Sequence, residues 1–197
     1  MNLVIISASQ QKQSNSKLVA QVLQDRAQHY SNISHIELQT LNLPFYSPDI
    51  DDMSFYCANW SDINEQLNNA DAFVMVTPEW NGTASPMLKN FLYYLDSAHS
   101  ANKPVCLVSV VFGINGAYPI AELKSNAFKN NKLVPIPDHL IIREVNQFLE
   151  DVKTGDSNHS LIARVDYSLE MLYQYAQALK PVQKLAHTYS SSFGQGM

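Results

Sequence analysis

The sequence is poor in cysteine and in charge. Only two of its 197 residues are cysteines, Cys57 and Cys106, and they stand far apart and outside any metal-ligand spacing. This argues against a disulfide scaffold or a zinc site. Charged residues make up 16% of the chain, below the roughly 25% usual for soluble domains, whereas hydrophobic residues make up 46%. A chain of this length and composition can bury a sizeable core, and we expect one domain.

The chain also lacks an excess of positive charge and a long apolar run. Its net charge is −5, from 13 basic and 18 acidic residues, so there is no basic field to drive nucleic-acid binding, and we expect no nucleic-acid partner. No apolar stretch reaches the ~18 residues of a membrane span, and the segment 1–6 has no cationic flank of the kind a signal peptide carries. We therefore expect a cytoplasmic protein with no membrane partner.

Several chemical signatures are missing as well. No Gly-x-Ser-x-Gly elbow supplies a hydrolase nucleophile. The six histidines are scattered, with no two at ligand spacing, so the sequence indicates no metal. Neither the Walker A motif nor the Gly-x-Gly-x-x-Gly dinucleotide fingerprint occurs. Hydrolase chemistry and the common glycine-rich nucleotide sites thus lack their usual residues.

What the chain does contain is an alternation of short apolar runs and helical patterns. Strands are expected at residues 3–6, 34–38, 72–76, 105–111 and 139–142, and helices at 18–27, 88–95 and 161–179. The three strongest strand candidates are continuously apolar, which is typical of strands buried on both faces. Strands alternating with helices predict an α/β fold, a doubly wound parallel sheet of five strands with helices on both faces.

Local signals predict several boundaries. Ser85 can cap the helix at 88–95, and Pro86 fits its first turn. Pro181 is expected to stop the last helix. We accordingly expect a domain at 1–181 and a polar tail at 182–197 that frays or covers a partner subunit. The stretch 39–59 has no periodicity and is expected to be an ordered loop.

Ligands of open α/β sheets bind beyond the C-terminal ends of the strands, so the segments that follow the strong strands are informative. The first, 7–16, holds four serines and one asparagine just before the helix expected to begin near Lys17. Hydroxyl and amide donors beside free backbone N–H groups at a helix N-terminus suit a phosphate. An ordinary polar turn with a serine cap is the alternative.

Two further segments follow the central strands. In 77–86, Trp80 stands in a polar, backbone-rich turn, where it can stack on a planar ring or belong to a subunit interface. In 109–118, Gly113 and Gly116 permit either a close backbone approach to a ligand or a tight turn.

Together these segments resemble the NADPH-dependent FMN reductase family, flavodoxin-like proteins that include quinone, chromate and azo-dye reductases. The family's first loop, roughly Gly-Ser-x-Arg-x-x-Ser-x-Asn, aligns with 8–16. Its Thr-Pro-Glu-Tyr-Asn motif, followed by Leu-Lys-Asn, is matched by 77–81 and 88–90, and its glycine turn is approached by 113–117. The resemblance covers about the first 120 residues and implies the flavodoxin-like strand order 2-1-3-4-5.

The resemblance also implies which residues contact FMN. The phosphate would be held by Ser9, Gln11, Ser14, Asn15 and Ser16. The ring would be bordered by Pro78, Glu79, Trp80, Asn81 and Gly82, mainly through backbone groups, and on its other side by Ser109, Gly113 and Gly116. Gln11 stands where the family usually has arginine, which removes one cation from the phosphate or nucleotide site; Lys12, the next residue, is the alternative cation.

The implied function is that of an FMN-containing oxidoreductase. NADPH or NADH would pass hydride to flavin N5, and the reduced flavin would then reduce a small acceptor such as a quinone, azo compound, metal oxyanion or free flavin. Because the cofactor performs the redox step, we name no catalytic side chain. The resemblance also implies a homodimer or homotetramer whose flavin sites are completed at the subunit interface. The alternative is a flavodoxin-like FMN electron carrier, or a flavin-binding module, without NAD(P)H turnover.

Overall fold

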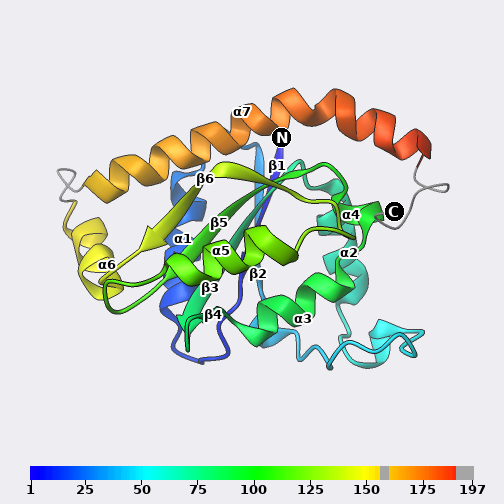
Figure 1. The fold of residues 1–197 in the computed structure, drawn as a ribbon, viewed down its shortest axis with the longest axis horizontal. Coiled ribbons are helices and arrows are strands. Elements are labelled where there is room, and N and C mark those ends of the chain that lie inside the picture. Colours follow the sequence, from blue (N-terminus) through cyan, green and yellow to red (C-terminus); the bar gives the residue numbers. More distant parts are fainter. Residues whose placement is uncertain (156–159, 190–197) are drawn as a thin grey trace.

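The computed structural model describes residues 1–155 and 160–189, and its centre is a twisted parallel sheet (Figure 1). The strands are β1 (Asn2–Ser7), β2 (Asn32–Glu37), β3 (Ala72–Trp80), β4 (Thr83–Ala84), β5 (Pro104–Val110) and β6 (Val134–Ile142). Five of them pair in parallel in the order β2-β1-β3-β5-β6, and β4 pairs antiparallel with β3. The predicted fold class is confirmed, but the sheet has an additional strand, so five strands in the order 2-1-3-4-5 is not an exact description.

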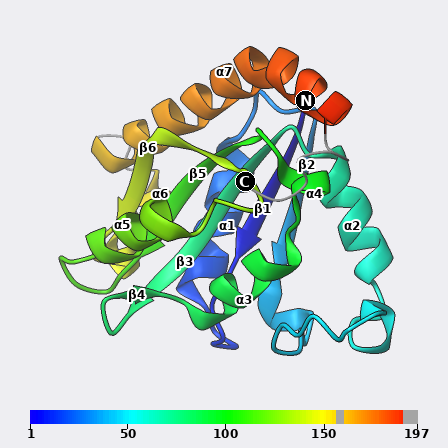
Figure 2. The same cartoon turned by 45° about the vertical axis from the view of Figure 1, so that its right-hand side comes forward.

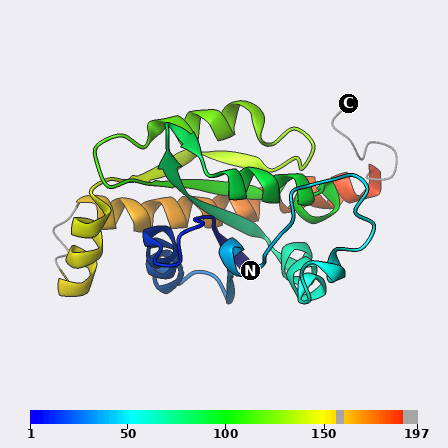
Figure 3. The same cartoon turned by 90° about the horizontal axis from the view of Figure 1, so that it is seen from below.

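Helices cover both faces of the sheet. They are α1 (Asn15–Arg26), α2 (Trp60–Asn69), α3 (Pro86–Tyr94), α4 (Ser97–Ser100), α5 (Ala117–Asn126), α6 (Val145–Thr154) and α7 (Ser160–Tyr189). One core cluster joins the sheet to α1, α6 and α7, and the other joins it to α2, α3 and α5. In the view from below, α5 (yellow-green) lies on one side of the strands and α1 (blue) and α7 (orange) on the other (Figure 3).

The two cores follow from the period of two along each strand. In β1, Leu3 and Ile5 point into the core under α1 and α7, whereas Val4 and Ile6 point into the core under α2 and α3. All four side chains are essentially inaccessible to solvent. This is why the strand is apolar at every position, and why such runs were recognisable in the sequence.

The segment between β2 and α2 is largely loop, as predicted (Figure 2). It contains two short 3₁₀ turns, Leu38–Thr40 and Met53–Phe55. Asn90 of α3 fixes its first half, because its Nδ2 donates to Pro44 O at 2.7 Å and its Oδ1 accepts from Tyr46 N at 2.8 Å. The helices α2, α4, α5 and α6 were not predicted; in α2, for example, only Ile63 and Leu67 are buried, too few for a clear stripe.

The predicted end of the last helix is wrong. Helix α7 continues through Pro181 to Tyr189. A proline at this position lacks the N–H that would bond to the carbonyl of Gln177, but both residues are exposed, so water can satisfy that carbonyl. Beyond the proline, Gln183 Nε2 donates to Asn102 O at 3.2 Å and ties the helix to the body of the protein. Residues 182–189 therefore continue a helix, and the rest of the predicted tail, 190–197, lies outside the described residues.

The long helix α7 is not a membrane span. Within residues 1–155 and 160–189, no helix combines the length and hydrophobicity that crossing a bilayer requires.

Candidate functional site

The first loop joins β1 to α1 and ends in a serine cap. Ser14 Oγ accepts a hydrogen bond from Lys17 N at 3.1 Å, which makes Ser14 the N-cap and starts the helix at Asn15, not near Lys17 as expected. Asn15 and Ser16 consequently lie in the first helical turn, where backbone N–H groups have no partner within the helix. Ser9 Oγ accepts from Gln11 N at 3.3 Å and shapes the loop before the cap.

His35 of β2, beside this loop, does not supply a positive charge. His35 Nε2 lies 2.8 Å from Ser7 Oγ. Burial lowers the pKa of His35; Glu37 opposes this shift and Lys17 adds to it. The Lys17 ammonium is itself paired with Glu37 at 2.7 Å. Neither His35 nor the Lys17 ammonium, which is paired with Glu37, therefore offers an uncompensated positive charge to an anion at this end of the sheet.

The second segment is a β-hairpin. Strand β3 runs on to Trp80 and turns through Asn81 and Gly82, whose φ angles of 51° and 68° are both left-handed. This is the backbone of the two-residue Asn-Gly turn that hairpins favour. Trp80 therefore ends a strand and pairs with Thr83, instead of lying in a loop as the sequence suggested.

The third segment, 109–118, is fastened to the turn between β6 and α6. Val145 N donates to Val111 O at 3.2 Å, and Glu144 N donates to Gly113 O at 3.3 Å. Arg143 Nε donates to the carbonyls of Ile114 and Asn115 at 2.6 and 2.9 Å. The loop within this segment ends at Gly116, which has a φ of 106° and caps α5.

The three segments meet around one cavity of about 280 Å³, just below the roughly 300–1,000 Å³ range of ligand pockets. Of the predicted site residues, those in its wall are Ser9, Gln11, Asn15, Ser16, Pro78, Glu79, Trp80 and Gly113. The other five, Ser14, Asn81, Gly82, Ser109 and Gly116, do not line it. Ser14 acts as the helix cap, Asn81 and Gly82 form the hairpin tip, and Ser109 lies beneath Gly116.

Five lining residues were not singled out from the sequence: Val110, Val111, Phe112, Asn115 and Val145. The first four fall within the glycine-containing segment 109–118, which follows a strong strand, and ligands of open α/β sheets bind beyond such strand ends. No sequence pattern indicated Val145 as a site residue, because it reaches the cavity only through the turn that follows β6.

The cavity wall suits a ligand with a polar end and a flat apolar body. Hydroxyl and amide groups line the side formed by the first loop, whereas Pro78, Trp80, Val111 and Phe112 are apolar. Glu79 Oε1 in the wall and the neighbouring Ser109 Oγ are buried without a hydrogen-bond partner in the described structure. Unsatisfied buried polar atoms at a cavity indicate a missing bonded group. The donors, the helix N-terminus and the flat walls together fit FMN.

The comparison with protein families gives the same answer. The family model for NADPH-dependent FMN reductases matches residues 1–147. The chain belongs to this family. The NADPH-dependent FMN reductase assignment confirms the function expected from the sequence, an NAD(P)H-dependent flavin oxidoreductase that uses FMN.

Related proteins agree with the family. The chain is 24% identical over 184 residues to an NADPH azoreductase of Bacillus sp. (strain OY1-2), covering 93% of this chain and 97% of that protein. It is 27% identical over 130 residues to an FMN-dependent NADPH-azoreductase of Staphylococcus aureus (strain USA300), covering 63% and 68%.

Solved structures support the fold. An oxidoreductase from Corynebacterium diphtheriae has a TM-score of 0.67 at 15% identity, covering 90% of this chain and 97% of that one. FerB, a flavoenzyme NAD(P)H:(acceptor) oxidoreductase from Paracoccus denitrificans, has a TM-score of 0.65 at 19% identity, covering 88% and 98%.

Proposed function

We propose that this FMN reductase holds FMN in the cavity formed by the three segments and passes electrons from NAD(P)H to a small acceptor. The observation that carries this proposal is the convergence of eight predicted contact residues on one cavity at the C-terminal edge of the sheet. These residues come from three separate stretches of the sequence, 9–16, 78–80 and 113. If the motif matches were accidental, there would be no reason for these stretches to meet in the fold.

The first loop is assigned to the FMN phosphate. Ser9, Asn15 and Ser16 offer neutral donors, and the α1 N-terminus adds its partial positive charge. No lysine or arginine lines this cavity within the described residues. Phosphate binding here would depend on hydrogen bonds more than on ion pairs.

The hairpin and the third segment are assigned to the ring. When bound, FMN supplies the redox chemistry, taking up hydride and delivering electrons to the acceptor. The protein would hold the ring between Pro78–Trp80 on one side and Gly113 on the other. Glu79 Oε1, buried without a partner, is available to accept a hydrogen bond from an N–H at the ring edge.

The acceptor class follows from the relatives. Two related proteins are named azoreductases, and a structural neighbour is named an NAD(P)H:(acceptor) oxidoreductase. We infer a small-molecule acceptor of the azo or quinone kind. A cytoplasmic location remains a prediction.

We also infer a homodimer or homotetramer. Large apolar side chains are exposed at several places, among them Phe112, Ile114 and Tyr118 near the cavity, and Phe45, Tyr46, Phe55, Tyr56 and Tyr93 on the loop before α2 and on α3. Exposed aromatic groups of this kind are typical of subunit contacts. Sedimentation equilibrium across a range of concentrations tests this inference, and a monomer throughout would contradict it.

The function is tested by anaerobic spectroscopy and calorimetry. The purified protein should bind FMN, and its visible absorption should bleach on adding NADPH; binding without bleaching would indicate an electron carrier. FMN should bind more tightly than riboflavin, because charge-assisted hydrogen bonds to phosphate contribute about 1.5–3 kcal/mol each. Equal affinities would refute the phosphate assignment.

A matched pair of serine variants localises the site. Ser16→Ala removes a hydroxyl from the cavity wall and should weaken FMN binding roughly tenfold to a hundredfold without affecting riboflavin. Ser168→Ala removes an equally buried hydroxyl from α7, outside the residues that line the cavity, and should leave FMN affinity unchanged.

A further inference from the structure

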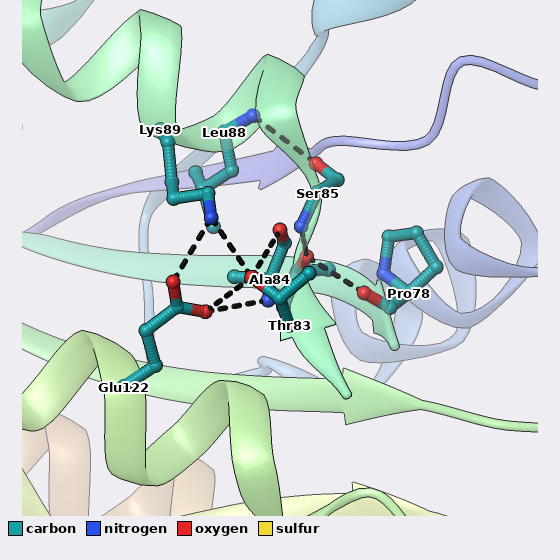
Figure 4. A network of polar contacts seen from close by, with 8 residues as sticks. Pro78, Thr83, Ala84, Ser85, Leu88, Lys89 and Glu122 are labelled. Carbon is teal, nitrogen blue, oxygen red and sulfur yellow. Dashed lines mark hydrogen bonds and ion pairs between the residues drawn. The ribbon is translucent and has the colours of Figure 1, made fainter. Parts of the chain in front are cut away.

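One carboxylate joins three elements beside the cavity. Glu122 of α5 accepts hydrogen bonds through Oε2 from Thr83 Oγ1 at 2.7 Å and from Ala84 N at 2.8 Å (Figure 4). Its Oε1 pairs with Lys89 Nζ of α3 at 2.9 Å. Lys89 Nζ also donates to Thr83 Oγ1 at 2.8 Å. The returning strand of the hairpin is thus held between two helices by a closed set of charged and neutral hydrogen bonds.

The hairpin depends on such outside contacts. Strand β4 has two residues and only two register pairs with β3, Glu79 with Ala84 and Trp80 with Thr83. A two-stranded hairpin is marginally stable by itself. On its inner side, Ser85 N donates to Thr77 Oγ1 at 2.9 Å. On its outer side, β4 forms hydrogen bonds with Glu122 and Lys89.

Helix α5 connects this hairpin to the opposite wall of the cavity. It is capped by Gly116, directly after the segment whose Gly113 and Asn115 line the cavity. Glu122, further along the same helix, reaches the hairpin that carries Pro78–Trp80. A change in the hydrogen bonds between Glu122 and the hairpin would therefore move the hairpin wall of the cavity relative to the wall formed by the third segment.

Hydrogen bonds and the charge of Lys89 stabilise the ionised form of the Glu122 carboxylate. Burial alone would raise the pKa of Glu122, but hydrogen bonds from Ala84 N, Lys89 and Thr83, together with the charge of Lys89, lower it overall. The Glu122 side chain is 27% exposed and that of Lys89 is 40% exposed. The carboxylate is accordingly ionised at neutral pH, and removing either partner leaves the other partly buried without its opposite charge.

We propose that Glu122 is a positioning residue for the flavin ring: by holding Thr83 and Ala84 it sets the spacing between the hairpin wall and the third-segment wall. The proposal rests on the placement of FMN in this cavity. It assigns to Glu122 no contact with the reacting atoms.

The test is Glu122→Gln in the FMN-loaded protein. Glutamine keeps an oxygen for Ala84 N and Thr83 but loses the charge that pairs with Lys89. We expect the Kd for FMN to rise about tenfold and the visible circular dichroism of bound flavin to change. Asp166→Asn is the control, because it removes the charge from another helix-to-helix pair, Arg26–Asp166, outside the cavity wall. It should leave both readouts unchanged.

Thr83→Val provides a milder second variant with nearly the same shape. It removes one hydroxyl bonded to Glu122, and we expect a smaller rise in the Kd for FMN in the same direction. Glu122→Gln combined with Lys89→Met should be no worse than the more damaging single change, because both residues act through one contact.

A merely structural role for Glu122 would lower the thermal midpoint of the apoprotein while leaving the Kd for FMN and the flavin dichroism as in the wild type. That result in both Glu122→Gln and Thr83→Val would overturn the proposal. If instead wild-type protein binds FMN and Ser16→Ala has no effect on it, the assignment of the cavity fails first. Weaker FMN binding in Ser16→Ala with unchanged binding in both Glu122→Gln and Thr83→Val would refute the positioning role alone.

Discussion

Gly116 and Ile141 are packed so closely that a β-carbon on Gly116 would lie 2.3 Å from Ile141 Cγ2. The φ of 106° at Gly116 is also one that side-chain-bearing residues rarely adopt. The glycine is needed here both for the backbone conformation and for the approach of β6 to the start of α5.

Gly116→Ala should therefore destabilise the protein by about 1–3 kcal/mol, from backbone strain and overpacking. Urea denaturation measures this loss. Gly113→Ala is the control, since a β-carbon there would meet no heavy atom within 4 Å, and it should change the free energy of unfolding little. Equal effects in the two variants would contradict this explanation.

Trp80→Ala should weaken FMN binding while leaving the fold largely intact. Trp80 lines the cavity, and its pairing with Thr83 is made by the backbone, which the substitution retains. Stacked aromatic contacts are worth about 0.5–1.5 kcal/mol beyond area burial, or roughly two- to tenfold in Kd. The other tryptophan, Trp60, packs edge-on against Tyr94, and Trp60→Ala should not affect flavin. Unchanged flavin affinity and turnover in Trp80→Ala would show that its ring is not part of the site.

Discrimination between NADPH and NADH should be weak in the wild type. Gln11 lines the cavity where the family usually has arginine, and a guanidinium is the better partner for a 2′-phosphate. If that position serves the nucleotide, Gln11→Arg should raise kcat/KM for NADPH relative to NADH roughly tenfold. If it serves the flavin phosphate, FMN should bind more tightly at an unchanged ratio.

Gln10→Arg is the matched control for Gln11→Arg. Gln10 lines a different cavity, so the same charge placed there should change neither quantity. A hundredfold preference of the wild-type enzyme for NADPH would refute the premise that the missing arginine matters.

The stability contributed by Glu122 should depend on pH. Its pKa in the folded protein is lowered from the ordinary value of 4.5. A group of this kind stabilises the fold above its unfolded pKa, and the contribution is lost as the pH falls through the lower, folded value. The difference in free energy of unfolding between wild type and Glu122→Gln should thus be largest above pH 4.5 and shrink in stronger acid. Chemical denaturation at several pH values measures it, and a difference that grew in acid would contradict the assigned contacts.

The sequence predicted the sheet well because its evidence is local. The apolar runs at 3–6, 72–76 and 105–111 are buried on both faces of the sheet. Burial on both faces requires an apolar residue at nearly every position, so these strands can be recognised from the sequence. The cap at Ser85 was also correct: its Oγ accepts from Leu88 N at 3.1 Å. The helix end predicted at Pro181 was wrong. The tendency of proline to end a helix was outweighed there by solvent exposure and by tertiary contacts further along α7.

The sequence by itself determined the fold class, the family and three of the segments that surround the cavity, because short apolar runs, caps and motif spacing are local properties. Only the tertiary structure decided which side chains share the cavity. It brought Val145 to the wall through a turn after β6, converted the segment around Trp80 into a hairpin, and placed Glu122 against Thr83 across 39 positions of chain. Such contacts depend on the relative placement of helices and strands, and no pattern within one segment specifies them.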